Sequence, residues 1–347
     1  MKAFKLTALR QMQLVDVPDL RLEKPTDVLI RMGAVGVCGS DIHYYTTGRI
    51  GSQVVEFPFA VGHECAGRVV EVGNAVTQVR PGDRITIEPA ITCGQCDQCR
   101  AGRENTCRHN RFLGCPGQAE GSLSDYLVMP EENCFKIPDD MTLGEATVAE
   151  PLAIAIYAVR QANTRAGDRI GILGLGPIGR TVQLAATDGG CGSVYATDLI
   201  EERCAAARSA GCDWVGNPQS EDVVATILER EPLGLDVVFE CCGQQASLDN
   251  AVELLRPGGT LVMIGIPEVD RIEFSPDKIR RRELTIVNIR RQRGCVEAAL
   301  DLIGRRQTAV RDLITHHFPF HQSDAAFELV ANYRDGVVKA MVEFDLS

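Results

Sequence analysis

Four cysteines lie within fifteen residues of one another in the spacing C-x2-C-x2-C-x7-C: Cys93, Cys96, Cys99 and Cys107. The segment that holds them, TCGQCDQCRAGRENTC, offers little apolar periodicity from which a core could form. Four thiolates at such short separations can surround one tetrahedral Zn²⁺ and fill every coordination position. Two disulfides, or four unrelated thiols, are the alternative. We expect a structural zinc in a lobe of residues 90–110, and a closed site of this kind leaves catalysis to other residues.

Charge and cysteine content exclude several classes of partner. The net charge of −11 over 347 residues argues against nucleic acid or an anionic membrane, because both demand a basic face. The sequence contains no run of eighteen or more apolar residues, so no membrane span is predicted. Fourteen cysteines without a secretory signal predict a cytoplasmic protein whose thiols are free or bound to metal.

The hydrophobic pattern divides the chain into two domains. Residues 1 to about 130 contain short strand-like runs, among them VLIRMGAV, RVVEVG and RITIEPA, separated by glycines and prolines. The pattern changes near Pro151, where a helical segment begins. From RIGILGLG onward, apolar strands alternate with helices, which indicates a doubly wound parallel sheet. We therefore predict an α/β protein with a Gly-rich β-domain of residues 1–150 and 290–347 and a Rossmann domain of residues 151–289.

A G-x-G-x-x-G motif, Gly174-Leu-Gly-Pro-Ile-Gly179, follows a predicted strand and opens a predicted helix. That context is typical of a dinucleotide site. Gly174 permits the tight turn, Gly176 the approach of the pyrophosphate, and Gly179 close packing of helix on strand. The first helical residues, Pro177 and Ile178, lie where free N–H groups and the helix dipole attract phosphate. A plain turn at a helix start is the alternative.

Asp198 ends the next strand, SVYATD, twenty-four residues after Gly174. A carboxylate there can accept hydrogen bonds from both ribose hydroxyls and would repel a 2′-phosphate, so NAD is favoured over NADP. Arg203 is the nearest cation along the chain, and we expect it to stack near the adenine rather than to bind a 2′-phosphate.

A second, open metal site is suggested by Cys38 in GVCGSD and by His63 and Glu64 in VGHECAG. Cysteine, histidine and a carboxylate make a plausible catalytic zinc set that leaves one position for water or substrate. Such a metal lowers the pKa of a bound hydroxyl. Spacing alone leaves open the alternative of a buried cysteine and a hydrogen-bonded histidine.

The run GHECAGRVVEVG resembles the zinc signature of the medium-chain dehydrogenase/reductase family, and CGSDIHYYTTGRIG resembles its polyol (sorbitol/xylitol) dehydrogenase branch. The four-cysteine lobe, the VAEPLA segment and the glycine motif follow in family order, so the resemblance covers essentially the whole chain. It implies a GroES-like fold for the first domain. It also implies a catalytic zinc held by Cys38, His63 and Glu64, with Glu150 binding the zinc or its water.

The resemblance assigns further roles. Ser40 and His43 would form a proton relay, and Tyr44, Glu150 and Arg290 would contact the polyol. Residues matching cofactor-binding positions are Gly174, Gly176, Pro177, Ile178, Gly179, Asp198, Arg203, Ile264, Gly265, Ile266, Asn288, Ile289 and Arg290. Adjacent residues of an extended strand point to opposite faces, so joint ligation by His63 and Glu64 needs a local bend. We expect one carboxylate of Glu64 and Glu150 close to the metal and the other bonded to its water or to substrate.

Two departures from the branch concern the metal and the substrate. Animal-type sorbitol dehydrogenases lack the structural zinc, whereas this chain keeps all four cysteines. Arg291 stands where the sorbitol enzymes usually place an aromatic residue, within the basic run NIRRQRG. It either tunes substrate choice or is a solvated or interface charge.

Together these features predict a zinc-dependent, NAD-linked dehydrogenase that oxidises a secondary alcohol of a small-molecule polyol to a ketose. It would carry two zinc ions and form a homo-oligomer, a tetramer or a dimer. A threonine or butanediol dehydrogenase of the same family is the nearest alternative. A non-catalytic NAD-binding regulator is the alternative from another class, and it would have no use for an open metal position.

Overall fold

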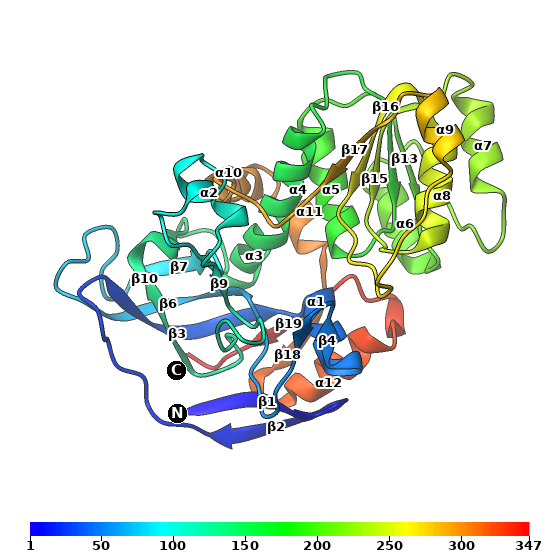
Figure 1. Ribbon diagram of the computed structural model, residues 1–347. Helices are drawn as coiled ribbons and strands as arrows, with labels where there is room; N and C mark the ends of the chain where they lie inside the picture. Colours follow the sequence, from blue (N-terminus) through cyan, green and yellow to red (C-terminus); the bar gives the residue numbers. More distant parts are fainter. Residues whose placement is uncertain (347) are drawn as a thin grey trace. The chain divides into compact units, whose positions relative to one another are not determined.

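The computed structural model describes residues 1–346 and contains two compact units (Figure 1). The first, the β unit, contains Met1–Glu150 and the chain from Val296 onward, and the second, the α/β unit, contains Pro151–Cys295. The chain thus returns to the β unit later than residue 290, the expected boundary. Cys295 remains with the α/β unit, where its thiol contacts the Arg160 guanidinium at 3.2 Å.

A seven-stranded sheet forms the centre of the β unit. Its order is β11-β7-β6-β3-β19-β18, with β10 also paired to β3. The last strand, β19, pairs antiparallel with β3, so the end of the chain is part of the sheet. Alternate residues of β3, including Ile30 and Met32, are fully buried in the core. This alternation explains why the VLIRMGAV run forms the central strand.

The strands of the β unit are β1 (Lys2–Ala8), β2 (Gln11–Asp16), β3 (Asp27–Gly36), β4 (Arg49–Ile50), β5 (Gln53–Val54), β6 (Glu64–Val72), β7 (Arg84–Ile87), β8 (Ala90–Ile91), β9 (Arg111–Phe112), β10 (Tyr126–Pro130), β11 (Cys134–Lys136), β18 (Ile314–Pro319) and β19 (Lys339–Glu343). Its helices are α1 (Gly39–Thr47), α2 (Asp97–Arg100), α3 (Leu143–Thr147), α10 (Val296–Arg305), α11 (Gln307–Arg311) and α12 (Ser323–Ala331). Helix α4 (Ala149–Gln161) begins in the β unit and continues into the α/β unit.

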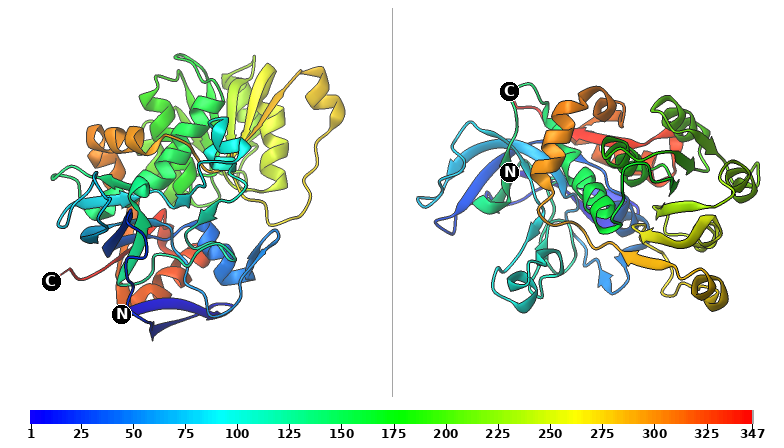
Figure 2. Two further views of the ribbon diagram at one scale, coloured as in Figure 1. Left: turned by 60° about the vertical axis from the view of Figure 1, so that its left-hand side comes forward. Right: turned by 90° about the horizontal axis from the view of Figure 1, so that it is seen from above.

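The α/β unit is a six-stranded parallel sheet of order β14-β13-β12-β15-β16-β17, with helices packed on it (Figure 2). Its strands are β12 (Ile170–Leu173), β13 (Val194–Thr197), β14 (Trp214–Gly216), β15 (Leu235–Glu240), β16 (Leu255–Met263) and β17 (Thr285–Asn288). Its further helices are α5 (Pro177–Asp188), α6 (Glu201–Ser209), α7 (Val223–Arg230), α8 (Gln245–Leu254) and α9 (Pro276–Arg281).

The strand order of this sheet reverses between β12 and β15, as in a Rossmann fold. Parallel strands need crossover connections, and the helices after β12, β13, β14 and β15 supply them. The predicted fold class, a β-domain with a doubly wound α/β domain, is confirmed. Over the described residues, no helix is both long and apolar enough to cross a membrane.

Candidate active site and metal centres

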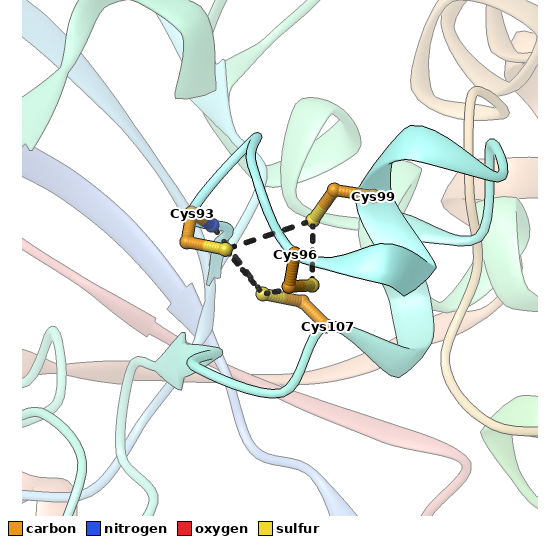
Figure 3. A group of neighbouring side chains, drawn as sticks. All are labelled: Cys93, Cys96, Cys99 and Cys107. Carbon is orange, nitrogen blue, oxygen red and sulfur yellow. Dashed lines mark hydrogen bonds between the residues drawn. The ribbon is translucent and has the colours of Figure 1, made fainter.

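The four cysteines of the lobe converge on one point (Figure 3). Neighbouring sulfurs are 3.5 to 4.0 Å apart, and none of the four cysteines forms a disulfide. A disulfide would need about 2.05 Å between sulfurs. Four sulfurs placed about 2.3 Å from one tetrahedral ion would lie about 3.8 Å apart. The donor set therefore fits one zinc ion.

Backbone N–H groups lower the pKa of the Cys93 and Cys96 thiols, whereas burial raises the pKa of the Cys99 thiol to about 12. Cys96 precedes the short helix α2 and Cys99 lies within it. Backbone hydrogen bonds from Cys99 and Arg108 lower the pKa of the Cys96 thiol to about 6. A thiolate is the form that binds zinc, so these N–H donors favour metal binding near neutral pH.

A second group of metal-ligating atoms lies in the β unit. Ligand atoms of Cys38, His63 and Glu64 are all within 4.8 Å of one another. Cys38 lies between β3 and α1, and His63 immediately precedes β6. His63 lies outside the strand, which begins at Glu64, so the alternation of side chains along an extended strand does not separate these two residues. Gly62 before them has a φ of 98°, a turn conformation that favours glycine.

Asp41, which no sequence motif indicated, forms hydrogen bonds to both sides of this group. Its Oδ2 accepts the Cys38 N–H at 3.2 Å, and its Oδ1 lies 3.3 Å from Nδ1 of His63. Oδ1 also accepts the Gly62 N–H at 3.2 Å. A carboxylate on one ring nitrogen orients the imidazole and leaves the other nitrogen for a metal. Its only sequence signal was an acidic residue in the first turn of a helix.

The electrostatic environment of this group favours a cation. Burial lowers the pKa of His63, but the charges of Asp41 and Cys38 raise it, and the net shift is well upward. Burial raises the pKa of Glu150 to about 8; the charges of Glu64 and Glu88 add to the shift, whereas His63 and Lys339 oppose it. Negative groups that draw a proton onto an imidazole also attract a divalent metal. A Cys/His/Glu donor set in this field fits a zinc ion with an open position.

Helix α1 carries the predicted relay residues. Ser40 and His43 are three positions apart, which places them on one side of the helix. Both are half-buried, and the Ser40 hydroxyl lies 3.3 Å from the Cys38 sulfur. Tyr44 is buried, and its hydroxyl lies 3.3 Å from Oε1 of Gln53 and 3.8 Å from the sulfur of Cys115.

The glycine motif of the α/β unit forms a close-packed turn between β12 and α5. Gly174 has a φ of 95°, a conformation that favours glycine. A Cβ on Gly179 would lie 1.8 Å from the Gly174 carbonyl oxygen, so helix and strand approach too closely for a side chain. Gly176 is the N-cap of α5 and Pro177 its first residue. The N–H groups of the following turn are therefore available to an anion.

Asp198 is tied to that turn. Its Oδ2 accepts the Leu175 N–H at 2.6 Å, and its Oδ1 accepts the Ile200 N–H at 2.9 Å. Arg203 is buried, and its Nη1 is 4.0 Å from Oδ2 of Asp198. The two residues thus lie beside the glycine turn, at the carboxyl edge of the sheet where ligands of this fold bind.

The other predicted cofactor residues lie at the same edge. Ile264, Gly265 and Ile266 directly follow β16, whereas Asn288 ends β17 and Ile289, Arg290 and Arg291 follow it. The Ile289 N–H donates to the Met263 carbonyl at 3.0 Å, which joins the ends of the two strands. Arg291 has a φ of 54°, a strained conformation for a side chain other than glycine.

Family models, sequence relatives and solved structures all indicate the same protein family for this chain. Residues 24–139 match the alcohol dehydrogenase GroES-like domain, and residues 177–305 match the zinc-binding dehydrogenase family. Sorbitol dehydrogenase of Bacillus subtilis is 34% identical over 99% of this chain and 97% of its own. L-idonate 5-dehydrogenase of Vitis vinifera is 37% identical over 88% of this chain and 85% of its own. A solved oxidoreductase of unknown specificity from Escherichia coli is 31% identical, with a TM-score of 0.92 over 99% of both chains. The predicted family is confirmed: this chain belongs to the zinc-dependent medium-chain dehydrogenases.

Proposed function

We propose that this protein oxidises a secondary hydroxyl of a sugar alcohol to a ketose, with zinc and NAD as cofactors. The convergence of Cys38, His63 and Glu64 within 4.8 Å is the observation that carries the proposal. When bound, zinc would polarise the substrate oxygen and NAD would accept the hydride. A second zinc in the four-cysteine lobe would serve structure alone.

The residues around the open site have distinct roles in this proposal. Cys38 and His63 hold the metal, and Asp41 fixes the His63 ring by accepting from Nδ1. Glu64 and Glu150 share the remaining position, with one near the metal and the other bonded to water or substrate. Two directly bound carboxylates with a thiolate would make the site anionic and weaken its pull on the substrate oxygen.

Proton removal is assigned to helix α1. Ser40 takes the proton of the reacting hydroxyl, and His43 passes it toward solvent. Their placement on one side of α1, and their partial exposure, support this path. A histidine suits the outer end of a relay, because one ring nitrogen can accept a proton while the other donates one.

Cofactor choice is assigned to Asp198. Its two oxygens already accept backbone N–H bonds, but each oxygen has a second lone pair for a ribose hydroxyl. A 2′-phosphate would meet this carboxylate directly and be repelled. Arg203 is buried near Oδ2 of Asp198 and neutralises part of the carboxylate charge. We therefore expect a strong preference for NAD, with some activity left with NADP.

The substrate class is inferred from the relatives and from the polar groups of the β unit. The two curated relatives described above are named for sorbitol and for L-idonate, and both compounds carry a chain of hydroxyl groups. Tyr44 and Glu150 of the β unit offer polar atoms to such a chain. Gln53 and Cys115 orient the Tyr44 hydroxyl.

A turnover assay tests the proposal. The purified protein is incubated with NAD or NADP and with sorbitol, xylitol, L-threonine or 2,3-butanediol, and formation of the reduced cofactor is followed. We expect turnover with at least one polyol and NAD. Faster oxidation of threonine or butanediol than of either polyol would replace the substrate assignment. Absence of turnover with every substrate, despite NAD binding and bound zinc, would favour a non-catalytic regulator.

We also propose a cytoplasmic homo-oligomer. In the described chain all fourteen cysteines are free thiols, as suits a reducing compartment. Strand β17 is an edge strand, paired on one side to β16, and such an edge can pair with a second copy. Sedimentation equilibrium tests the assembly, and a monomer at micromolar concentration would contradict it.

A further inference from the structure

Glu240 is a buried carboxylate in the α/β unit to which the proposed chemistry assigns no role. It is the last residue of β15, the strand next to the point where the strand order reverses. Its exposed fraction is only 1%. Burial of a carboxylate is unfavourable unless hydrogen bonds compensate for the lost water, so its partners indicate what it does.

The Glu240 side chain accepts hydrogen bonds from the turn that follows β15. Its Oε1 accepts the N–H groups of Cys242 and Gly243, both at 2.8 Å, and the hydroxyl of Ser247 at 2.9 Å. Ser247 belongs to α8, the helix after this turn. One carboxylate oxygen therefore sets the path of the chain from β15 into α8.

The backbone of Glu240 holds a second loop. Its carbonyl oxygen accepts the N–H groups of Ile264 and Gly265 at 2.9 and 3.0 Å. The two loops pack without side chains between them, since a Cβ on Gly265 would lie 2.2 Å from the Gly243 nitrogen and 2.7 Å from Oε2 of Glu240. Hydrogen bonds to the side chain and the backbone of Glu240 thus hold residues 241–243 and residues 264–266 next to one another.

We propose that Glu240 is a positioning residue for the nicotinamide half of the dinucleotide. In this fold each half of the sheet binds one mononucleotide, on either side of the strand-order reversal. The glycine turn and Asp198 follow β12 and β13 and serve the adenosine half. The loops fastened by Glu240 follow β15 and β16, so they serve the other half. The inference rests on the proposed NAD-linked function.

Separate titrations of NAD and AMP into the purified protein test this assignment. AMP occupies only the adenosine half. Glu240→Ala leaves three donors without their acceptor, so NAD affinity is expected to fall about tenfold or more. AMP affinity is expected to stay within about twofold. Glu240→Gln keeps an acceptor oxygen of the same reach and should restore NAD affinity to within about threefold of the unmutated protein.

Hydrogen exchange gives a readout that does not depend on the ligand. The amides of residues 241–243 and 264–266 should exchange faster in Glu240→Ala, whereas amides within β12 and β13 should be unchanged. Leu248→Ala is the matched control, because Leu248 is a buried residue of the same helix α8 that makes no bond to either loop. Leu248→Ala should lower the stability of the protein, but any change in affinity should be the same for NAD and for AMP. If Glu240→Ala fails to fold, Glu240→Asp replaces it, because aspartate is one methylene shorter and moves the carboxylate away from its donors. Glu240→Asp is also expected to lose NAD affinity while it keeps AMP affinity.

Equal loss of NAD and AMP affinity in Glu240→Ala and Leu248→Ala would overturn the assignment, because Glu240 would then act only on general stability. Normal NAD binding by folded Glu240→Ala or Glu240→Asp would also overturn it. Failure of the unmutated protein to bind NAD would instead overturn the proposed function, and the assignment with it.

Discussion

The ammonium group of Lys339 is paired with the carboxylate of Glu64, although both side chains are almost completely buried. Lys339 also donates to the Val37 carbonyl at 3.2 Å. Burial lowers the pKa of Lys339, but the charges of Glu64 and Cys38 outweigh this effect and raise it, so the ammonium stays charged. Strand β19 therefore brings a fixed cation against one carboxylate of the proposed catalytic metal group.

Replacement of Lys339 by an uncharged residue should make the thermal stability of the protein depend more strongly on bound zinc. Lys339→Met leaves Glu64 buried without its partner, which costs about 3–5 kcal/mol for a broken buried pair. A bound zinc would compensate for part of that loss. We expect the variant to lose more thermal stability than the unmutated protein when a chelator is added. Lys339→Arg, which keeps the charge, is the control. An equal effect of chelator on Lys339→Met and on the unmutated protein would contradict the coupling.

The two proposed zinc ions should be separable by mutation. Cys99→Ser removes one of four ligands from the closed lobe and should reduce zinc content from two ions to one per chain, with turnover per folded molecule largely retained. His63→Ala should remove the other zinc and abolish turnover while it leaves the lobe loaded. Metal content by mass spectrometry, together with polyol oxidation, checks both. Loss of both metals in His63→Ala would count against separate roles.

Cofactor preference should depend on Asp198. Asp198→Ala removes both the repulsion of a 2′-phosphate and the acceptors for the ribose hydroxyls. We expect kcat/KM to fall for NAD and to rise or stay level for NADP, so that their ratio narrows about tenfold or more. Asp198→Asn separates the two effects, because it removes the charge and keeps one acceptor. Equal efficiency of the unmutated protein with the two cofactors would refute the assignment.

An ion-pair cluster on β15 predicts a pH dependence of stability. Burial raises the pKa of Asp236, but hydrogen bonds from Arg169 and Arg256 outweigh this effect and lower it to about 2. Because the folded pKa lies below the ordinary value of 3.8, ionised Asp236 contributes stability above about pH 4. That contribution is lost as the pH falls toward 2.

Asp236→Asn should therefore lower the Tm of the α/β unit by about 2–6 °C near neutral pH. The difference from the unmutated protein should shrink below about pH 4, as Asp236 becomes protonated in both states. Thermal unfolding over a pH series checks this, with chelator present throughout so that loss of zinc does not contribute. A difference that stays constant down to pH 2 would show that the charge of Asp236 is not responsible.

Features encoded by nearby residues could be predicted from the sequence. The four cysteines lie within fifteen residues, and the glycine motif lies between one strand and one helix, so local spacing carried most of the information. The resemblance also predicted that His63 and Glu64 approach one centre, and their ligand atoms lie within 4.8 Å of one another. The parallel sheet followed from the alternation of strands and helices.

The remaining parts depend on contacts that no spacing reveals. Lys339 lies 275 residues after Glu64, and the two meet because β19 and β6 both pair with β3. Glu240 stands in the buried run DVVFE like any acidic residue at a strand end, and its role depends on the loop after β16. Strands β4, β5, β8 and β9 are two residues long, too short for a periodic pattern. Tertiary pairing decides such elements.

Anomalous scattering at the zinc edge from a crystal of the purified protein would locate both proposed zinc ions. We expect two peaks per chain, one among Cys93, Cys96, Cys99 and Cys107 and one beside Cys38 and His63. At the second site we expect one carboxylate of Glu64 and Glu150 at bonding distance, about 2.0–2.2 Å, and the other farther away. The protein for this crystal is supplemented with zinc and first shown to oxidise a polyol. If such protein gave a single peak, at the four-cysteine lobe, the proposed catalytic zinc would be wrong.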